Sequence, residues 1–273
     1  MRFSALASVL LTAMCALADN AEPQHPPQLQ PAAVQISTHE RSLGPNPTIV
    51  ASVETGITGE YVRRGARYLG SGMLSRMAFE RQFEGNFAFR GQVAPFYAFQ
   101  GGGLGETIFD VAVAAGGQRW LAGGTVVGGY TYYARSTNPA SRTFMGSNTQ
   151  EAYAGLEFTL PGQPFVYLRY DFDKGAGRRN DRVGTYVVAG ASHRIEINRD
   201  IAFAFQGRVG FDFGRGVGGF SDAQFTSLME LRPSRNLALT PTLDWWFPSG
   251  SVAPGVHGFR LVPSLGLRYS TSF

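Results

Sequence analysis

The chain has 273 residues and a formal net charge of +4, with 44% hydrophobic, 13% aromatic and only 16% charged residues. The charged fraction lies below the roughly one quarter that is typical of soluble domains. Beyond the N-terminal segment, no stretch approaches the roughly 20 apolar residues of a membrane helix, and no compact Lys/Arg block indicates nucleic-acid binding. This composition leaves a secreted all-β protein or a membrane β-barrel.

Residues 1–18 predict a cleaved signal peptide. Arg2 supplies the positive charge, Leu6 to Leu17 form a short apolar core, and Ala16-Leu17-Ala18 resembles a cleavage site. The single cysteine, Cys15, lies inside this segment, and the residues before it fit a lipoprotein site poorly. The mature chain would therefore contain no cysteine for a disulfide or a metal site, and we expect no metal and no cofactor.

Residues 19–47 predict a disordered periplasmic linker. The segment is polar and Gln-rich, and such a composition cannot bury enough apolar area to offset the cost of ordering the chain. A plain tether is favoured over a segment that binds a periplasmic partner, which stays the alternative. The prolines that interrupt it are Pro23, Pro26, Pro27, Pro31, Pro45 and Pro47.

From residue 48 onward the hydrophobic pattern has a period of two, which predicts strands. In residues 200–213, for example, Phe203, Phe205 and Phe211 share one face while Gln206 and Arg208 share the other. The same pattern predicts twelve strands, most of them long enough to cross hydrocarbon at the roughly 9–11 residues that a tilted strand needs. The predicted ranges are 49–62, 72–83, 86–98, 106–115, 119–133, 150–160, 164–173, 183–196, 200–213, 220–232, 236–247 and 260–273.

The predicted connections alternate between short turns and longer loops. Gaps after even-numbered strands are tight, whereas residues 63–71, 134–149, 174–182 and 248–259 form longer gaps after odd-numbered strands. This alternation is typical of outer-membrane barrels, and it places both ends of the barrel on the short-turn, periplasmic side. A sheet in lipid must close on itself because unpaired edge groups cost several kcal/mol each. We therefore expect an all-β, transmembrane, antiparallel up-and-down barrel over residues 48–273.

Aromatic residues near the strand ends predict interface belts. We place Phe165, Phe203, Tyr269 and Phe273 in the periplasmic belt. We place Tyr97, Phe211, Phe213, Trp245 and Phe247 in the outer belt.

The last strand, with alternating apolar residues that end in Tyr269, Thr271 and Phe273, resembles the C-terminal recognition signal of Gram-negative outer-membrane proteins. This resemblance implies an outer-membrane location and contact with the assembly machinery through Tyr269 and Phe273. Within that class, residues 59–65 (Gly-Glu-Tyr-Val-Arg-Arg-Gly) resemble the S-D-Y-x-x-R-G segment of a TorF-like outer-membrane family, with Gly-Glu in place of Ser-Asp. Residues 166–173 and 184–186 also resemble a recurrent segment of such barrels. The family implies no established activity.

Alternation predicts which charged side chains face the barrel lumen. These residues would line either a narrow hydrated pore or an interior plug of ion pairs, and glycines 116, 117, 123, 124, 128 and 129 would leave room for water or let the sheet bend. The lumen candidates are Glu54, Glu60, Arg76, Glu80, Arg90, Glu157, Arg169, Asp171, Arg194, Arg208, Asp212, Glu230, Asp244 and Arg268.

The long loops are basic and predict contact with lipopolysaccharide phosphates. The candidates for this contact are Arg63, Arg64, Arg67, Arg178, Arg179 and Arg182. Catalytic residues are not expected, because Ser192 and the adjacent His193 would point to opposite faces of a strand. The leading hypothesis is thus a monomeric, porin-like, non-enzymatic barrel that passes small polar solutes. The alternatives are a structural or interaction barrel with a plugged lumen, and an outer-membrane lipid-modifying hydrolase.

Overall fold

The computed structural model describes residues 49–63, 66–83, 87–99, 103–116, 124–135, 148–172, 184–214, 217–248 and 258–272. The predicted signal peptide and linker, and Arg64, Arg178, Arg179, Arg182 and Phe273, lie outside the described residues. Within the described part of the chain, no helix is long and apolar enough to cross a membrane.

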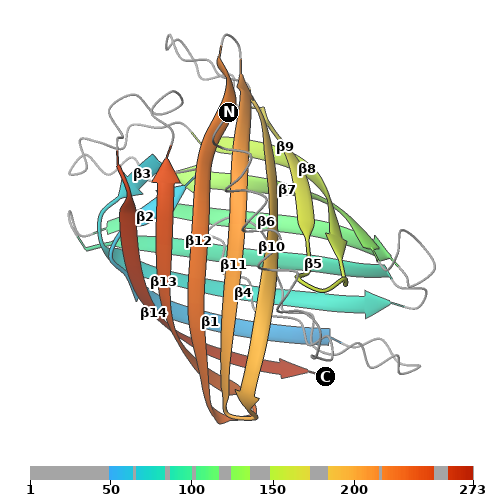
Figure 1. Ribbon diagram of the computed structural model, residues 1–273, viewed down its shortest axis with the longest axis vertical. Helices are drawn as coiled ribbons and strands as arrows, with labels where there is room; N and C mark the ends of the chain where they lie inside the picture. The colour runs from blue at the N-terminus through green and yellow to red at the C-terminus, as the bar shows by residue number, and fades with distance from the viewer. Residues whose placement is uncertain are drawn as a thin grey trace.

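Twelve strands form one closed antiparallel barrel in which sequence neighbours are also spatial neighbours (Figure 1). This confirms the predicted fold class and strand count. The barrel strands are β1 (Ile49–Thr58), β4 (Gly72–Phe83), β5 (Phe87–Ala98), β6 (Gly103–Gly116), β7 (Gly124–Arg135), β8 (Thr149–Phe158), β9 (Phe165–Asp171), β10 (Thr185–Asn198), β11 (Ile201–Gly214), β12 (Val217–Ser234), β13 (Leu237–Pro248) and β14 (Arg260–Ser272).

The first and last barrel strands close the sheet. β1 pairs with β14 from Val50 opposite Ser272 to Thr58 opposite Ser264, and its other edge pairs with β4. Every barrel strand therefore has a partner on both sides, which removes the unpaired edge groups that hydrocarbon would not tolerate. Ile49 and Ser272 lie at the end of the barrel that also carries the tight turns after Asn198 and Ser234.

Burial alternates along the strands with the predicted period of two. On β6, for example, Ile108, Asp110 and Ala112 are buried while Phe109 and Val111 are exposed. The exposed faces are apolar around the whole cylinder, from Val53 on β1 to Leu267 on β14. A surface of this kind suits lipid tails, because a soluble monomer rarely exposes more than a few hundred Å² of contiguous apolar area.

One predicted strand is wrong in its extent. Residues 49–62 were expected to form a single strand, but β1 ends at Thr58 and the chain continues into a separate two-stranded sheet. This sheet, which we call the mouth hairpin, consists of β2 (Tyr61–Arg63) and β3 (Ala66–Leu69). The Gly59 N–H still donates to the Pro263 carbonyl, and beyond this bond the chain leaves the ladder and turns to the inner side of the wall.

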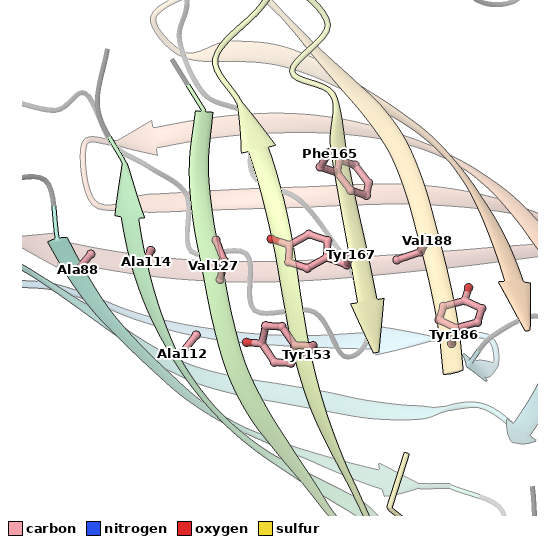
Figure 2. Packing of buried hydrophobic residues seen from close by; sticks show 9 residues of the cluster. All are labelled: Ala88, Ala112, Ala114, Val127, Tyr153, Phe165, Tyr167, Tyr186 and Val188. Atoms are coloured by element: carbon pink, nitrogen blue, oxygen red, sulfur yellow. The ribbon is translucent and has the colours of Figure 1, made fainter. Parts of the chain in front are cut away.

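Large rings lie over glycines on the inner wall from β7 to β11. A Cβ on Gly155 would overlap the Tyr167 ring, and a Cβ on Gly190 would stand 2.6 Å from Phe165. Figure 2 shows Phe165, Tyr167 and Tyr186 on this wall. Phe165 is only 3% exposed, so its predicted place in the periplasmic aromatic belt is wrong: the ring covers the side-chain-free surface of Gly190 instead of facing lipid.

This packing predicts that the inward glycines are sensitive to a single added methyl group. Gly155→Ala should lower the free energy of unfolding by about 1–3 kcal/mol, because the Tyr167 ring must shift from a close-packed position. Gly207→Ala is the matched control, since nothing lies within 4 Å of its added Cβ. Urea titration of both variants in detergent micelles measures the difference, and equal midpoints would contradict the packing.

Candidate functional site

The inner wall of the barrel is polar and carries most of the charged side chains. The predicted lumen residues occupy inward positions by the burial alternation, and most of them take part in ion pairs. Several inward acidic residues and two arginines were missed by the sequence analysis. Those on β8, β10, β12 and β14 share the parity of residues that were named, whereas no residue of β6 was named. The missed residues are Glu106, Asp110, Glu151, Glu196, Asp222, Arg232 and Arg260.

Arg90 connects β4 and β8 near the ends of their strands on the short-turn side. Its Nε lies 3.1 Å from Glu80 on the neighbouring strand, and its Nη1 lies 3.3 Å from Glu157 on β8. Because β6 and β7 separate these strands, the guanidinium reaches across their inner surface, where Ala112 and Ala114 are small. Ion pairing of this kind offsets the cost of burying each charge.

A second network lies closer to the loop end, around Arg169. The Arg169 guanidinium lies 3.2 Å from Glu151 and stands over the Tyr153 ring at 5.0 Å. The Tyr153 hydroxyl donates to Asp110 at 2.9 Å, and the Thr131 hydroxyl donates to the same carboxylate. These contacts fix side chains from β6, β7, β8 and β9 against the wall.

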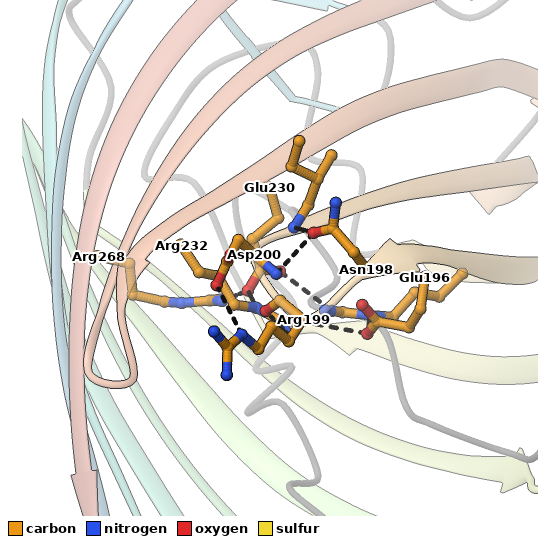
Figure 3. Close-up of polar contacts among 9 residues, drawn as sticks. Glu196, Asn198, Arg199, Asp200, Glu230, Arg232 and Arg268 are labelled. Carbon is orange, nitrogen blue, oxygen red and sulfur yellow. Dashed lines mark hydrogen bonds and ion pairs between the residues drawn. The ribbon is translucent and has the colours of Figure 1, made fainter.

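A third network lies at the periplasmic end and centres on Glu230 (Figure 3). Its carboxylate accepts from Arg194 at 3.0 Å, from Arg232 at 2.6 Å and from Arg268 at 2.9 Å. Glu196 pairs with Arg194 and Arg232 as well. The groups come from β10, β12 and β14, so one carboxylate ties three strands that are not direct neighbours.

The mouth hairpin folds onto the inner wall at the loop end. Tyr61 is 2% exposed, stacks on Phe96 with ring centroids 4.7 Å apart and donates to Glu106 at 2.7 Å. Val62 packs in a cluster with Trp246 on β13 and Val262 on β14, which lie on the other side of β1 from Phe96 on β5. Contacts on both sides of β1 hold the hairpin against the inner wall at the loop-side mouth.

Glu60 adds an ion pair to these contacts. Its carboxylate lies 3.1 Å from Nη1 of Arg260 on β14. Because this pair joins the start of the mouth hairpin to the barrel wall, the hairpin is anchored by charge as well as by packing.

A cavity of about 110 Å³ lies beneath the mouth hairpin. It is bounded by residues of β1, β2, β4, β5, β6, β13 and β14, and we call it the seam chamber because it borders the closure between β1 and β14. Its lining includes Glu54, Thr240, Asp244, Leu74 and Ile108. One part of its wall thus carries oxygen acceptors and another carries aliphatic side chains.

Arg208 differs from the other described inward arginines because no carboxylate of the described residues lies within salt-bridge distance of it. Its Nε donates to Gln224 at 2.6 Å, and its guanidinium stands 4.9 Å from the centre of the Trp246 ring. Gln224 in turn donates to Asp244 at 2.7 Å, and Thr226 donates to the same Asp244 oxygen. Asp244 is therefore held by neutral donors.

The other predicted sites are only partly within the described structure. The side chains of Arg63 and Arg67 lie outside it, as do Arg64, Arg178, Arg179, Arg182 and Phe273, whereas Tyr269 is exposed on the outer face of β14. Ser192 is buried, and the next residue of β10, His193, is half-buried, so the two side chains point to opposite faces of the strand. Among the described residues, no group of three or more His, Cys, Asp or Glu side chains is arranged to hold a metal ion.

Comparison with known proteins found no matching family model and no matching curated protein. Among solved structures, the NanC porin is 11% identical with a TM-score of 0.50, over 80% of this chain and 98% of that chain. The KdgM porin, solved in complex with disordered oligogalacturonate, is 12% identical with a TM-score of 0.45, over 81% and 99%. An outer-membrane channel from Pseudomonas putida F1 is 11% identical with a TM-score of 0.48, over 90% and 100%.

The likeness to NanC is a likeness of fold. It shows that this chain has the closed antiparallel barrel of outer-membrane β-barrel proteins, in agreement with the apolar outer face described above. At this level of identity it assigns neither a solute nor a partner.

The Glu230 network predicts a strong dependence of stability on one carboxylate. Glu230→Gln keeps the shape but leaves three arginines without their shared charge, so we expect a loss of about 3 kcal/mol in the free energy of unfolding. Asp200→Asn is the control, because its pair with Arg199 is exposed and 3.9 Å long and should change stability by less than about 1 kcal/mol. Similar urea midpoints for the two variants would mean that the network contributes little.

Proposed function

We propose that this protein is a monomeric outer-membrane barrel of a Gram-negative bacterium that provides a narrow passive channel for small polar solutes. The observation that carries this proposal is the combination of a lipid-compatible outer face with a charged inner wall that encloses the seam chamber. A barrel of twelve strands lies between filled eight-stranded barrels and wide sixteen-stranded porins, so its interior has room for small solutes only.

The mouth hairpin would set the narrowest part of this pathway on the loop side. Tyr61 and Val62 contact the wall on the two sides of β1, and their neighbours Phe96 and Trp246 are almost fully buried. A solute that enters from outside must pass beside these side chains. The charges below them would orient solutes without trapping them, because most of these charges already have a partner.

Single-channel recording in a planar bilayer tests the channel and its constriction together. Tyr61→Ala removes the ring that stacks on Phe96, so conductance should rise by roughly twofold or more as the mouth widens. Tyr97→Ala is the matched control. Tyr97 follows Phe96 on β5, but its ring is exposed on the outer face of the barrel, so the conductance of this variant should equal that of the native protein. If the native protein and Tyr61→Ala both fail to conduct and to swell liposomes, the channel proposal is wrong.

A structural or interaction barrel with a plugged lumen is the second candidate. It is favoured by the same hairpin contacts and by the ion pairs that cover the wall, since a fully packed interior would leave no path. Residues 19–47 would then tether the barrel to a periplasmic partner. Co-purification of a partner that is lost when residues 19–47 are deleted, together with zero conductance, would favour this candidate over the channel.

Two surface contacts complete the proposal. Arg63, Arg64, Arg67, Arg178, Arg179 and Arg182 would bind lipopolysaccharide phosphates, and the C-terminal strand with Tyr269 and Phe273 would be recognised by the assembly machinery. The resemblance of residues 59–65 to the TorF-like family supports a relationship with that family. In this chain the segment includes β2 of the mouth hairpin. Members of that family with the same motif would then have the same constriction.

A further inference from the structure

We infer that the seam chamber is a binding site for a small organic cation, namely an ammonium group that carries a short hydrocarbon chain. The inference rests on the proposed channel, because it names the solute class that would occupy a station on that pathway. It depends on three features of the chamber: its origin in glycines at the barrel closure, its oxygen atoms without partners, and its unequal charge.

Two glycines create the space. Gly56 on β1 lies opposite Gly266 on β14, and Gly266 lies opposite Thr240 on β13. All three line the chamber. Because neither of these two facing residues has a side chain, they leave a hollow in an inner wall that is otherwise covered by long side chains. The hollow is therefore fixed by the two glycines at the closure of the barrel.

Oxygen atoms without partners surround this hollow. Thr240 is 2% exposed, and its Oγ1 is buried without a hydrogen-bond partner. It lies 2.6 Å from the point where a Gly266 Cβ would stand, and Glu54 Oε1 lies 3.2 Å from the same point. Glu54 uses its other oxygen to bind Arg76. A buried hydroxyl without a hydrogen-bond partner destabilises the folded protein, and a ligand that bonds with it removes this penalty.

The charge balance of the described lining favours a positive ligand. Arg76 neutralises Glu54, and Arg260 neutralises Glu60. Asp244 also lines the chamber, but it is bound only by Gln224 and Thr226, both through Oδ1. Its negative charge therefore has no ion-pair partner within 4 Å among the described residues, and the one cation known to act on it is Arg208, which binds the same Gln224 and does not line the chamber. An ammonium group could donate to Asp244 Oδ2, Thr240 Oγ1 and Glu54 Oε1 or to a pair of them, whereas a carboxylate would face like charge.

The remaining wall suits a short hydrocarbon chain. Leu74, Ala94 and Ile108 come from three successive strands and face the chamber, and Val262 lines it from β14. Ala94 and Ile108 belong to one buried cluster against which Leu74 packs. A cavity of about 110 Å³ accepts a molecule of only a few heavy atoms, and placing its carbons here removes apolar surface from water.

The test compares three probes of one shape: n-propylammonium, n-propanol and propionate. Each is titrated into the detergent-folded full chain, and binding is followed by ligand-observed NMR, which does not require conduction. We expect propylammonium to bind at least about tenfold more tightly than either of the others, because only its charged donor forms charge-assisted hydrogen bonds with the carboxylates. Equal binding of all three probes would overturn the inference, as would a chamber that holds only water.

Variants localise the binding to the chamber. Thr240→Val keeps the shape and removes the hydroxyl, Asp244→Asn removes the unmatched charge, and Gly266→Ala fills the hollow; each should weaken propylammonium binding by about tenfold or more. Thr55→Val is the matched control, because Thr55 neighbours Glu54 in sequence but is exposed on the outer face. Heat-modifiable electrophoresis shows whether each variant is folded. Unchanged binding in folded Thr240→Val and Asp244→Asn would overturn the inference.

The site and the channel can fail separately. Selective binding of propylammonium without conductance would support the cation site and contradict the channel. Conductance with no selective binding would support the channel and contradict the cation site.

Discussion

Closure of the sheet by β1 and β14 is the constraint on which the rest of this structure depends. Hydrocarbon offers no hydrogen bonds, so every backbone group of a spanning sheet must find its partner within the protein. The register from Val50–Ser272 to Thr58–Ser264 supplies these partners for the two terminal strands. Closure also separates two environments, because alternate side chains then face lipid or an enclosed lumen. The apolar outer face and the charged inner wall both follow from this separation.

An enclosed lumen of this size forces charged side chains to bind one another. Water can reach them only partly, so each carboxylate must be paired or hydrogen-bonded to stay ionised without a large desolvation cost. The networks around Arg90, Arg169 and Glu230 meet this requirement and also tie strands that are not adjacent. The interior therefore contributes to stability while it narrows the lumen, and Asp244 stands out because neutral donors hold it.

The strands and their two faces could be predicted from the sequence because lipid imposes a strict alternation of apolar side chains. The mouth hairpin could not, since residues 59–62 continue the pattern of β1 and only distant partners such as Phe96 and Trp246 draw them inward. Phe165 was placed wrongly for a similar reason. A phenylalanine suits a lipid interface and equally suits the bare surface of Gly190, and sequence alone does not show which glycine lies across from it. The signal peptide, the linker and the basic loops stay predictions.

Paired charged side chains fill a lumen, whereas glycines leave it open, and both occur at the closure of this barrel. Arg76 and Glu54 bind each other across β1 and β4, which draws two long side chains to the wall. Gly56 and Gly266 then leave the space beside them empty of side-chain atoms. A larger residue at either position would fill the hollow against the neighbouring backbone or the Thr240 hydroxyl. Open volume in a narrow barrel thus arises where glycines meet on adjacent strands, and its chemistry is set by whichever oxygen atoms the surrounding ion pairs leave unused.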